Sequence, residues 1–364
     1  MRFVVAFLCL AIPSTALAQQ AVNEQLRCPE CQIELEYRCT LGSSDGPGEL
    51  RSIPYRGTVD SRGRLVILQP NTGDLASVFD QDCDFVQRIG REGEGPNEYG
   101  NLKYVRASGD QLLLWDAANG RLTWVSPEYE ETRTRLMESQ LHDVLELSDG
   151  RLVANVSIRR EATSGYALHL IAADGRMLHS FDTHAILYGD ATSFFRHLFP
   201  STSGGFWSVN AYSRYSIAEW TADATEIRRF SREAYEPYGL PNYGSKSTDT
   251  PPHWRVKGGW VEGDTLWLVS RLPDERWREG VLDAEPSESE PGAAGSFPLK
   301  DMKKAYDEVL EAIDLNSGQV IARHVEDFPN LRMVLGPRMI GRWERDDLGW
   351  YHLRVYNVRF DGRQ

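Results

Sequence analysis

The sequence lacks the short motifs that would identify a common catalytic site. It contains no HExxH zinc motif and no Walker loop ending in lysine followed by serine or threonine. Zincin and P-loop nucleotide chemistry are therefore without support. The 8 histidines are scattered along the chain. The sequence alone identifies neither a reaction nor a ligand.

The chain also lacks an N-terminal hydrophobic run long enough to cross a bilayer. The run from Phe3 to Ile12 is shorter than the roughly 20 residues that a spanning helix needs, and Pro13 ends it. Ala16-Leu17-Ala18 fits the small-x-small pattern that precedes signal cleavage. We predict a secretory signal over residues 1–18, cleaved after Ala18, and a secreted or periplasmic protein. The alternative is an N-terminal membrane anchor, which the shortness of the run disfavours.

Positive charge is scarce. Lysine and arginine number 40 against 53 aspartates and glutamates, which gives a net charge of −13, and loss of Arg2 with the signal makes it −14. Nucleic acids and anionic membranes are themselves polyanions. We therefore expect no nucleic-acid partner and no membrane insertion. We also expect a monomer.

Cysteine is limited to 5 residues, one of which, Cys9, lies in the predicted signal. The others are Cys28, Cys31, Cys39 and Cys83. Export favours disulfides over free thiols. A redox pair or half of a zinc site at Cys28 and Cys31 remains an alternative, but no βαβ pattern follows and the first histidine is His142. The pairing is left open.

One motif occurs twice. Asp45-Gly-Pro-Gly-Glu-Leu50 and Glu94-Gly-Pro-Asn-Glu-Tyr99 each follow a β-rich run, and their glutamates, Glu49 and Glu98, are 49 residues apart. Self-similarity at this period in a β-rich chain indicates a propeller.

Turn signals give the number of blades. Six times a Gly/Asp/Ser turn precedes a strand-like run, and we assign each turn to the link between strands a and b of a blade. The six are Ser61–Gly63, Ser108–Asp110, Ser148–Gly150, Ser203–Gly205, Glu262–Asp264 and Asp347–Gly349. The chain has too few residues after Asp361 to form strand d of the last blade. We expect the strand-like run Ile33–Leu41 to supply that strand.

The fold class predicted is therefore all-β: a six-bladed β-propeller, closed by the N-terminal strand. It is a single domain over residues 19–364, with loop insertions at 234–257 and 272–306. The alternative is an open β-sandwich with accidental turn spacing.

The repeated motif, as Leu41–Leu50 and Gly90–Tyr99, resembles the signature of exported bacterial six-bladed propeller proteins. Asp116-Ala-Ala-Asn-Gly-Arg-Leu-Thr-Trp-Val125 resembles an NHL-type repeat. The resemblance, to NHL-like or TolB-like propellers, implies the fold and an exported location. Most members of this group have no assigned activity, so it supplies no catalytic residues.

Four long connections mark one face. In an antiparallel blade the b–c and d–a loops emerge together, and insertions on one face of a repeat array often mark its binding side. The connections are Arg159–Tyr166, His184–Ala191, Ala234–Lys257 and Leu272–Tyr306. Within the last of these, Asp283–Gly295 is acidic and poor in apolar residues, and Leu299–Tyr306 is compatible with a short helix.

Aromatic and basic side chains in the third connection suit stacking and cation–π contacts with a ligand. The predicted ligand-binding residues there are Tyr238, Tyr243, His253, Trp254 and Arg255. The alternative is a loop that packs on itself over the channel. Glu49 and Glu98 are further candidates, as a cation site or as acid and base. Repetition favours a different role, in which each glutamate caps backbone N–H groups of its Gly-Pro turn.

We predict an exported module that binds a small molecule, glycan or protein through this loop face, without a cofactor. The alternative is a metal-dependent lactonase, lyase or hydrolase. It would hold an ion such as Ca²⁺ at the channel mouth, within a ring of Asp, Glu, Asn or His side chains.

Overall fold

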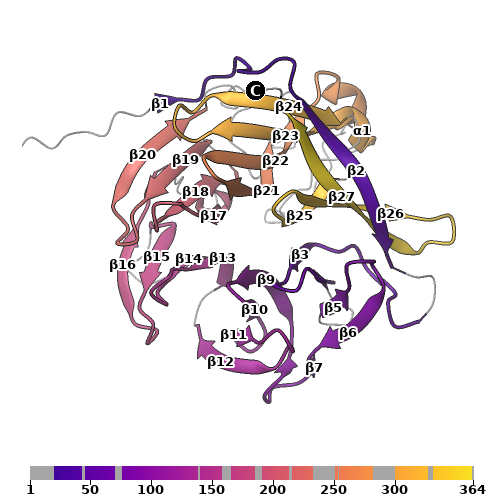
Figure 1. Ribbon diagram of the computed structural model, residues 1–364, viewed down its shortest axis with the longest axis vertical. Coiled ribbons are helices and arrows are strands. Elements are labelled where there is room, and N and C mark those ends of the chain that lie inside the picture. Colours follow the sequence, from indigo (N-terminus) through magenta and orange to yellow (C-terminus); the bar gives the residue numbers. More distant parts are fainter. Residues whose placement is uncertain are drawn as a thin grey trace, which may run out of the picture.

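The computed structural model describes residues 20–42, 46–69, 76–137, 140–157, 165–184, 191–212, 215–232, 251–252, 254–281, 300–326 and 331–362. Within them the chain forms six blades arranged in a ring (Figure 1). The predicted all-β, six-bladed β-propeller is confirmed. No helix in these residues is long and apolar enough to cross a membrane.

Each blade has four antiparallel strands, named a to d from the axis outward. Blade 1 contains β3 (Arg56–Val59), β4 (Leu65–Leu68), β5 (Ala76–Phe79) and β6 (Phe85–Ile89). Blade 2 contains β9 (Leu102–Ser108), β10 (Gln111–Asp116), β11 (Arg121–Val125) and β12 (Glu131–Leu136). Blade 3 contains β13 (Gln140–Glu146), β14 (Leu152–Ser157), β15 (Leu168–Ile171) and β16 (Met177–Phe181).

The second half of the ring repeats this order. Blade 4 contains β17 (Arg196–Pro200), β18 (Phe206–Asn210), β19 (Ser216–Trp220) and β20 (Glu226–Ser231). Blade 5 contains β21 (Arg255–Glu262), β22 (Thr265–Pro273), β23 (Tyr306–Asp314) and β24 (Val320–Glu326). Blade 6 contains β25 (Leu331–Gly336), β26 (Met339–Arg345), β27 (Tyr351–Asp361) and β2 (Gln32–Leu41).

The sequence of each strand reflects its place in the blade. Strands β4 and β5 are buried at every position, because neighbouring blades cover both of their faces. The outermost strand β12, Glu-Thr-Arg-Thr-Arg-Leu, alternates between partly buried and exposed side chains. Between blades 1 and 2, Val66 and Val78 pack in one cluster with Val105 and Leu112. Each such buried aliphatic side chain contributes about 1.5–3 kcal/mol.

The ring closes as predicted, through the N-terminal strand. β2 pairs antiparallel with β27, from Gln32 opposite Asp361 to Leu41 opposite Leu353. The last blade is thereby completed with residues from the other end of the chain. Closure pairs a strand edge that would otherwise be open to association with other chains.

Two disulfides settle the pairing that the sequence left open. Cys39, in β2, is bonded to Cys83, in the c–d turn of blade 1. This bond crosses the seam between the last blade and the first. Cys28 and Cys31 are bonded to each other, three positions apart.

An N-terminal arm precedes β2, and the sequence did not predict it. β1 (Gln20–Ala21) pairs in parallel with β20 of blade 4, and the Asn23 amide donates to the Gly318 carbonyl of blade 5 at 3.0 Å. The Glu24 carboxylate accepts hydrogen bonds from Arg232 and Arg323. The arm therefore spans the outer strands of two blades before the chain enters blade 6.

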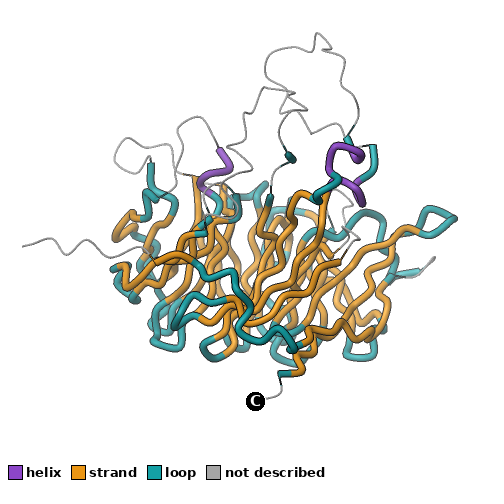
Figure 2. The backbone as a smooth tube through the Cα atoms, turned by 90° about the horizontal axis from the view of Figure 1, so that it is seen from above, coloured by secondary structure: helices purple, strands orange, loops and turns teal. Residues whose placement is uncertain are grey.

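One turn assignment was wrong. Asp347–Gly349 joins strands b and c of blade 6, not a and b, because β27 runs without interruption from Tyr351 to Asp361. Strands a and b meet instead at Pro337-Arg338, where Arg338 has a φ of 55°. An arginine in this left-handed conformation is uncommon, so a search for Gly, Asp and Asn misses the turn. The short helix expected within Leu299–Tyr306 is confirmed as α1 (Met302–Ala305), and Figure 2 shows the described helices on one face of the ring.

Replacing Cys39 and Cys83 with serine should lower the free energy of unfolding by roughly 3–4 kcal/mol, because the bond closes a long loop in the unfolded chain. The two cysteines are 44 positions apart. The matched control replaces Cys28 and Cys31, only three positions apart, and should lose less. Urea unfolding followed by tryptophan fluorescence measures both. Equal losses in the two double variants would contradict this account of the seam.

Candidate functional site

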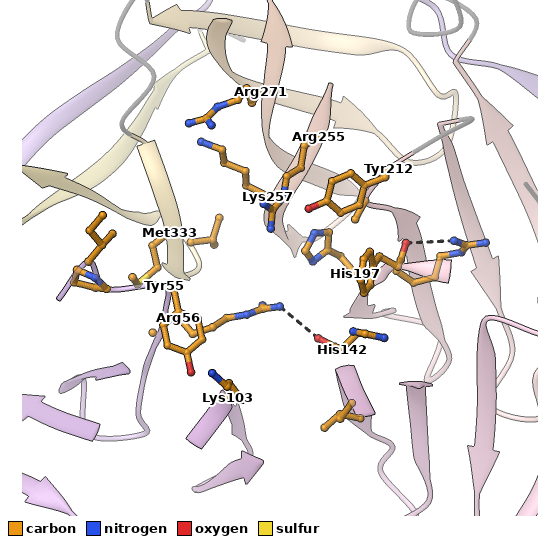
Figure 3. A pocket seen from close by; sticks show the side chains of 18 residues that line it. Tyr55, Arg56, Lys103, His142, His197, Tyr212, Arg255, Lys257, Arg271 and Met333 are labelled. Atoms are coloured by element: carbon orange, nitrogen blue, oxygen red, sulfur yellow. Dashed lines mark hydrogen bonds between the residues drawn. The ribbon is translucent and has the colours of Figure 1, made fainter. Parts of the chain in front are cut away.

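The first strands of all six blades surround a cavity of about 420 Å³ (Figure 3). Many of its lining residues lie at the beginnings of these strands, such as Arg56 in β3 and Arg255 in β21, and Arg271 lies in the second strand of blade 5, β22. This is the end of the axis at which each d strand leads into the next a strand. The cavity therefore lies on the face that the sequence predicted to bind a ligand, and we call it the mouth.

The mouth is strongly cationic. Five basic side chains converge on it (Figure 3), and no aspartate or glutamate is among the described residues that line it. The five are Arg56, Lys103, Arg255, Lys257 and Arg271. A sixth basic lining residue, Arg196, is committed elsewhere, because its fully buried guanidinium donates to Asp182 at 2.8 Å. The charge of the mouth thus opposes the net charge of −13 of the whole chain.

Two of the five cations share one buried carboxylate behind the wall. Glu308 is fully buried, and its Oε1 accepts from Arg271 Nε at 2.9 Å and Nη2 at 2.7 Å and also from Lys257. One carboxylate therefore contacts two of the basic side chains. This ion-pair cluster fixes both side chains at the wall.

The other three cations contact neutral groups. Arg56 donates to the His142 carbonyl at 3.4 Å, and its guanidinium lies 5.2 Å from the centre of the Tyr104 ring. Arg255 lies over the Tyr212 ring at 5.1 Å, and the Lys103 ammonium is 6.0 Å from the Tyr55 ring. Within the described part of the chain, no carboxylate forms an ion pair with these three. Their charge remains available to an anion.

A second cavity, of about 290 Å³, continues along the axis and shares Arg56, His197 and Lys257 with the mouth. Among the described residues that line it, the one carboxylate is that of Asp143, which accepts from the Tyr104 hydroxyl at 2.5 Å and from Arg106 Nη1 at 3.0 Å. Burial by itself would raise the pKa of Asp143, but His197 and the charges of Arg106 and Arg56 lower it to about 2. Asp143 is therefore ionised and already compensated.

The pKa of His142, which lines the mouth, is strongly lowered. Burial, followed by the positive charge of Arg56, lowers the pKa of its imidazole to about 4. The ring packs edge-on against Phe195, with centroids 4.2 Å apart. His142 is therefore neutral at neutral pH and offers a polar but uncharged surface beside the cations.

Only some of the ligand-binding residues predicted in the connection Ala234–Lys257 lie at this site. Arg255 lines the mouth, whereas Tyr238, Tyr243 and His253 lie outside the described residues. Trp254 is 5% exposed and belongs to a buried cluster, where its ring lies 5.6 Å from that of Tyr215. Trp254 therefore offers little surface for stacking against a ligand.

The two repeated glutamates are not among the residues that line the mouth. Glu98 accepts from the Gly95 amide at 2.9 Å and from Arg91 Nε at 2.8 Å, and these contacts lower its pKa. Glu49 lies 3.4 Å from Arg51 Nε. The contacts of Glu98 favour the turn-capping role over a catalytic one.

The glycines of the repeat have a packing role. Gly90 has a φ of +69°, and a Cβ there would lie 2.5 Å from the buried Tyr99 ring. Gly42 has a φ of +97°, and a Cβ there would lie 3.1 Å from the Leu50 side chain. In both copies the chain doubles back over the residue that follows the glutamate. The repeat is thus a structural device of the d–a connection.

Across the described ranges, no three His, Cys, Asp or Glu side chains are grouped so that they could hold a metal ion. The enzyme alternative expects a ring of Asp, Glu, Asn or His at the channel mouth, and of these residue types the described lining of the mouth has His142 and His197. The sequence did not predict four of the lining cations: Arg56, Lys103, Lys257 and Arg271. All but Arg271 lie within three residues of the start of an a strand, so aligning the blades at that point would have found them.

The propeller resembles solved structures that share little sequence with it. A predicted exported protein from Bacteroides fragilis NCTC 9343 is 12% identical, with a TM-score of 0.58, and the alignment covers 94% of this chain and 100% of that one. A member of the DUF4221 family from Bacteroides vulgatus ATCC 8482 is 13% identical, with a TM-score of 0.60, covering 91% and 99%. At these identities the likeness shows the fold alone. No family model and no curated protein sequence matches the chain.

Alanine substitution should change the free energy of unfolding strongly at Trp254 and hardly at Arg255. Trp254→Ala removes a buried ring and should lower the free energy of unfolding by about 3–5 kcal/mol. Arg255→Ala removes an exposed side chain and should change stability by less than about 0.5 kcal/mol. Chemical denaturation of the two variants measures this. Unchanged stability in Trp254→Ala would contradict the placement of its ring in the core.

Acidification should destabilise the protein through its buried histidines. Burial lowers the pKa of both His142 and His169 to about 4, from 6.5. Between these pH values the unfolded chain binds protons that the folded protein excludes, so the free energy of unfolding falls as the pH falls. Each histidine contributes about 1.4 kcal/mol per unit of pKa difference.

Urea unfolding at pH 7, 5.5 and 4.5 measures this pH dependence. His142→Asn should have a shallower fall in stability than the unsubstituted protein, and the exposed His179→Asn should serve as an unchanged control. The same pH dependence in all three proteins would contradict a neutral His142.

Proposed function

We propose that the protein is an exported binding module whose mouth captures a negatively charged small molecule or glycan. The observation that carries the proposal is the lining of the mouth, which has five converging cations and, in the part of the chain that the structure describes, no carboxylate. The signal-like residues 1–18 and two disulfides support export to the periplasm or beyond. The Asp116–Val125 pattern supports an NHL-like or TolB-like propeller.

The electrostatics favour an anion over a neutral ligand. Cations in a concave site with low-dielectric walls focus the field and raise the local concentration of anions. Arginine adds a planar set of donors that matches carboxylate, sulfate and phosphate oxygens. Each charge-assisted hydrogen bond to such a group contributes about 1.5–3 kcal/mol.

A metal-dependent enzyme at the same place has less support. Two unit charges of like sign 4 Å apart repel by about 4 kcal/mol at the effective dielectric constant of a protein surface. Five cations would thus oppose a divalent ion at the mouth. His142 is neutral at neutral pH, and His197 Nε2 lies 3.0 Å from the Val256 carbonyl, so we assign both side chains to ligand contact rather than to metal binding.

Calorimetric titration with matched probes tests the proposal. Glucuronate and glucose share a pyranose ring and differ in charge, and sulfate supplies a compact anion. Anions should bind and glucose should not, and anion affinity should fall with added salt. Arg56→Gln should weaken anion binding by roughly 10- to 100-fold, in line with one charge-assisted hydrogen bond.

The charge-matched control is Arg359→Gln, on β27 far from the mouth, where the side chain is 66% exposed and paired with Glu36. It should leave anion binding unchanged. The proposal fails if no anion binds at millimolar concentration, or if Arg56→Gln and Arg359→Gln weaken binding equally.

A further inference from the structure

The cations of the mouth fall into two groups on different walls. Blades 1 and 2 supply Arg56 and Lys103, and blade 5 supplies Arg255, Lys257 and Arg271. In a ring of six blades, blade 2 lies opposite blade 5. Figure 3 shows Arg56 and Lys103 on one side of the cavity and the blade 5 side chains on the other.

Uncharged side chains separate the two groups. On blades 3 and 4, Phe195 lies between His142, at a centroid distance of 4.2 Å, and Tyr212, at 5.5 Å. Blade 6 adds Met333 and Val334 on the other flank. These walls offer aromatic and apolar contact area, with His142 held neutral.

Each group includes cations that form no ion pair with a carboxylate of the described residues. In the blade 5 group, Lys257 and Arg271 contact Glu308, while Arg255 contacts the Tyr212 ring. In the group of blades 1 and 2, Arg56 contacts the His142 carbonyl and the Tyr104 ring, and Lys103 lies near the Tyr55 ring. One anionic group seated on either wall leaves the cations of the opposite wall, Arg255 or Arg56 and Lys103, without an anionic partner.

We infer that the ligand of the mouth is a small molecule with two separated anionic groups, one for each cationic wall, joined by a planar or apolar body. This inference rests on the proposed anion-binding function and narrows its ligand class. The aromatic sector of blades 3 and 4 contacts the body of the ligand, and the walls of blades 1–2 and blade 5 contact its two ends.

Matched aromatic acids test this inference by calorimetry on the full-length mature protein. Benzene-1,4-dicarboxylate carries two separated charges, benzoate carries one on the same ring, and sulfate carries two in one compact group. The dicarboxylate should bind at least about tenfold more tightly than benzoate, since its second carboxylate gains a charge-assisted contact. Sulfate should bind more weakly than the dicarboxylate.

Two exposed or half-exposed cations on opposite walls provide the variants, Lys103→Gln and Arg255→Gln. Each should bring the affinity for the dicarboxylate down to about that for benzoate. The charge-matched control Arg359→Gln should keep the full difference between the two acids, and thermal unfolding of all three variants confirms that they are folded.

Equal affinity for benzoate and the dicarboxylate, or tighter binding of sulfate, would overturn the two-wall inference and leave anion binding intact. Loss of dicarboxylate affinity in only one of the two wall variants would also overturn it. If none of these anions binds, the proposed function itself fails with it.

Discussion

The pairing of β2 with β27 is the constraint on which the rest of the structure depends. Without the N-terminal strand the last blade has only three strands and an open edge. With it, and with the Cys39–Cys83 bond across the seam, the six a strands are held around one axis. Residues as distant in sequence as Arg56 and Arg271 thereby line one cavity. The binding site is a consequence of ring closure, because no single blade contains it.

The mouth concentrates positive charge in a chain that is otherwise acidic. Like charges in one cavity repel, so the arrangement does not serve stability. The protein limits the cost by placing Glu308 behind two of the cations and aromatic rings beneath others. Sites where a sequence departs from the arrangement that folding favours are often functional. The buried Asp182–Arg196 pair differs from the mouth, because its positive charge is paired with a negative one.

Local sequence signals predicted the fold well and the site poorly. Glycine and aspartate turns, together with strand-like runs that are apolar on both faces, predicted the number of blades. The run Ile33–Leu41 predicted closure of the ring. Arg338 adopts a left-handed turn without glycine, so one turn was misassigned. The mouth is formed by single residues from all six blades, and no local pattern unites Arg56, Lys103 and Lys257. Trp254 and Arg255 are neighbours, yet one packs in the core and the other lines the mouth.

The most direct test of anion capture is an anomalous difference map from crystals soaked in selenate. Selenate has the charge and shape of sulfate, and its selenium atom locates it without ambiguity. The account predicts a peak in the mouth, within hydrogen-bonding distance of Arg56 or of the blade 5 cations Arg255 and Lys257. Selenate bound at surface arginines, with none in the mouth, would contradict it.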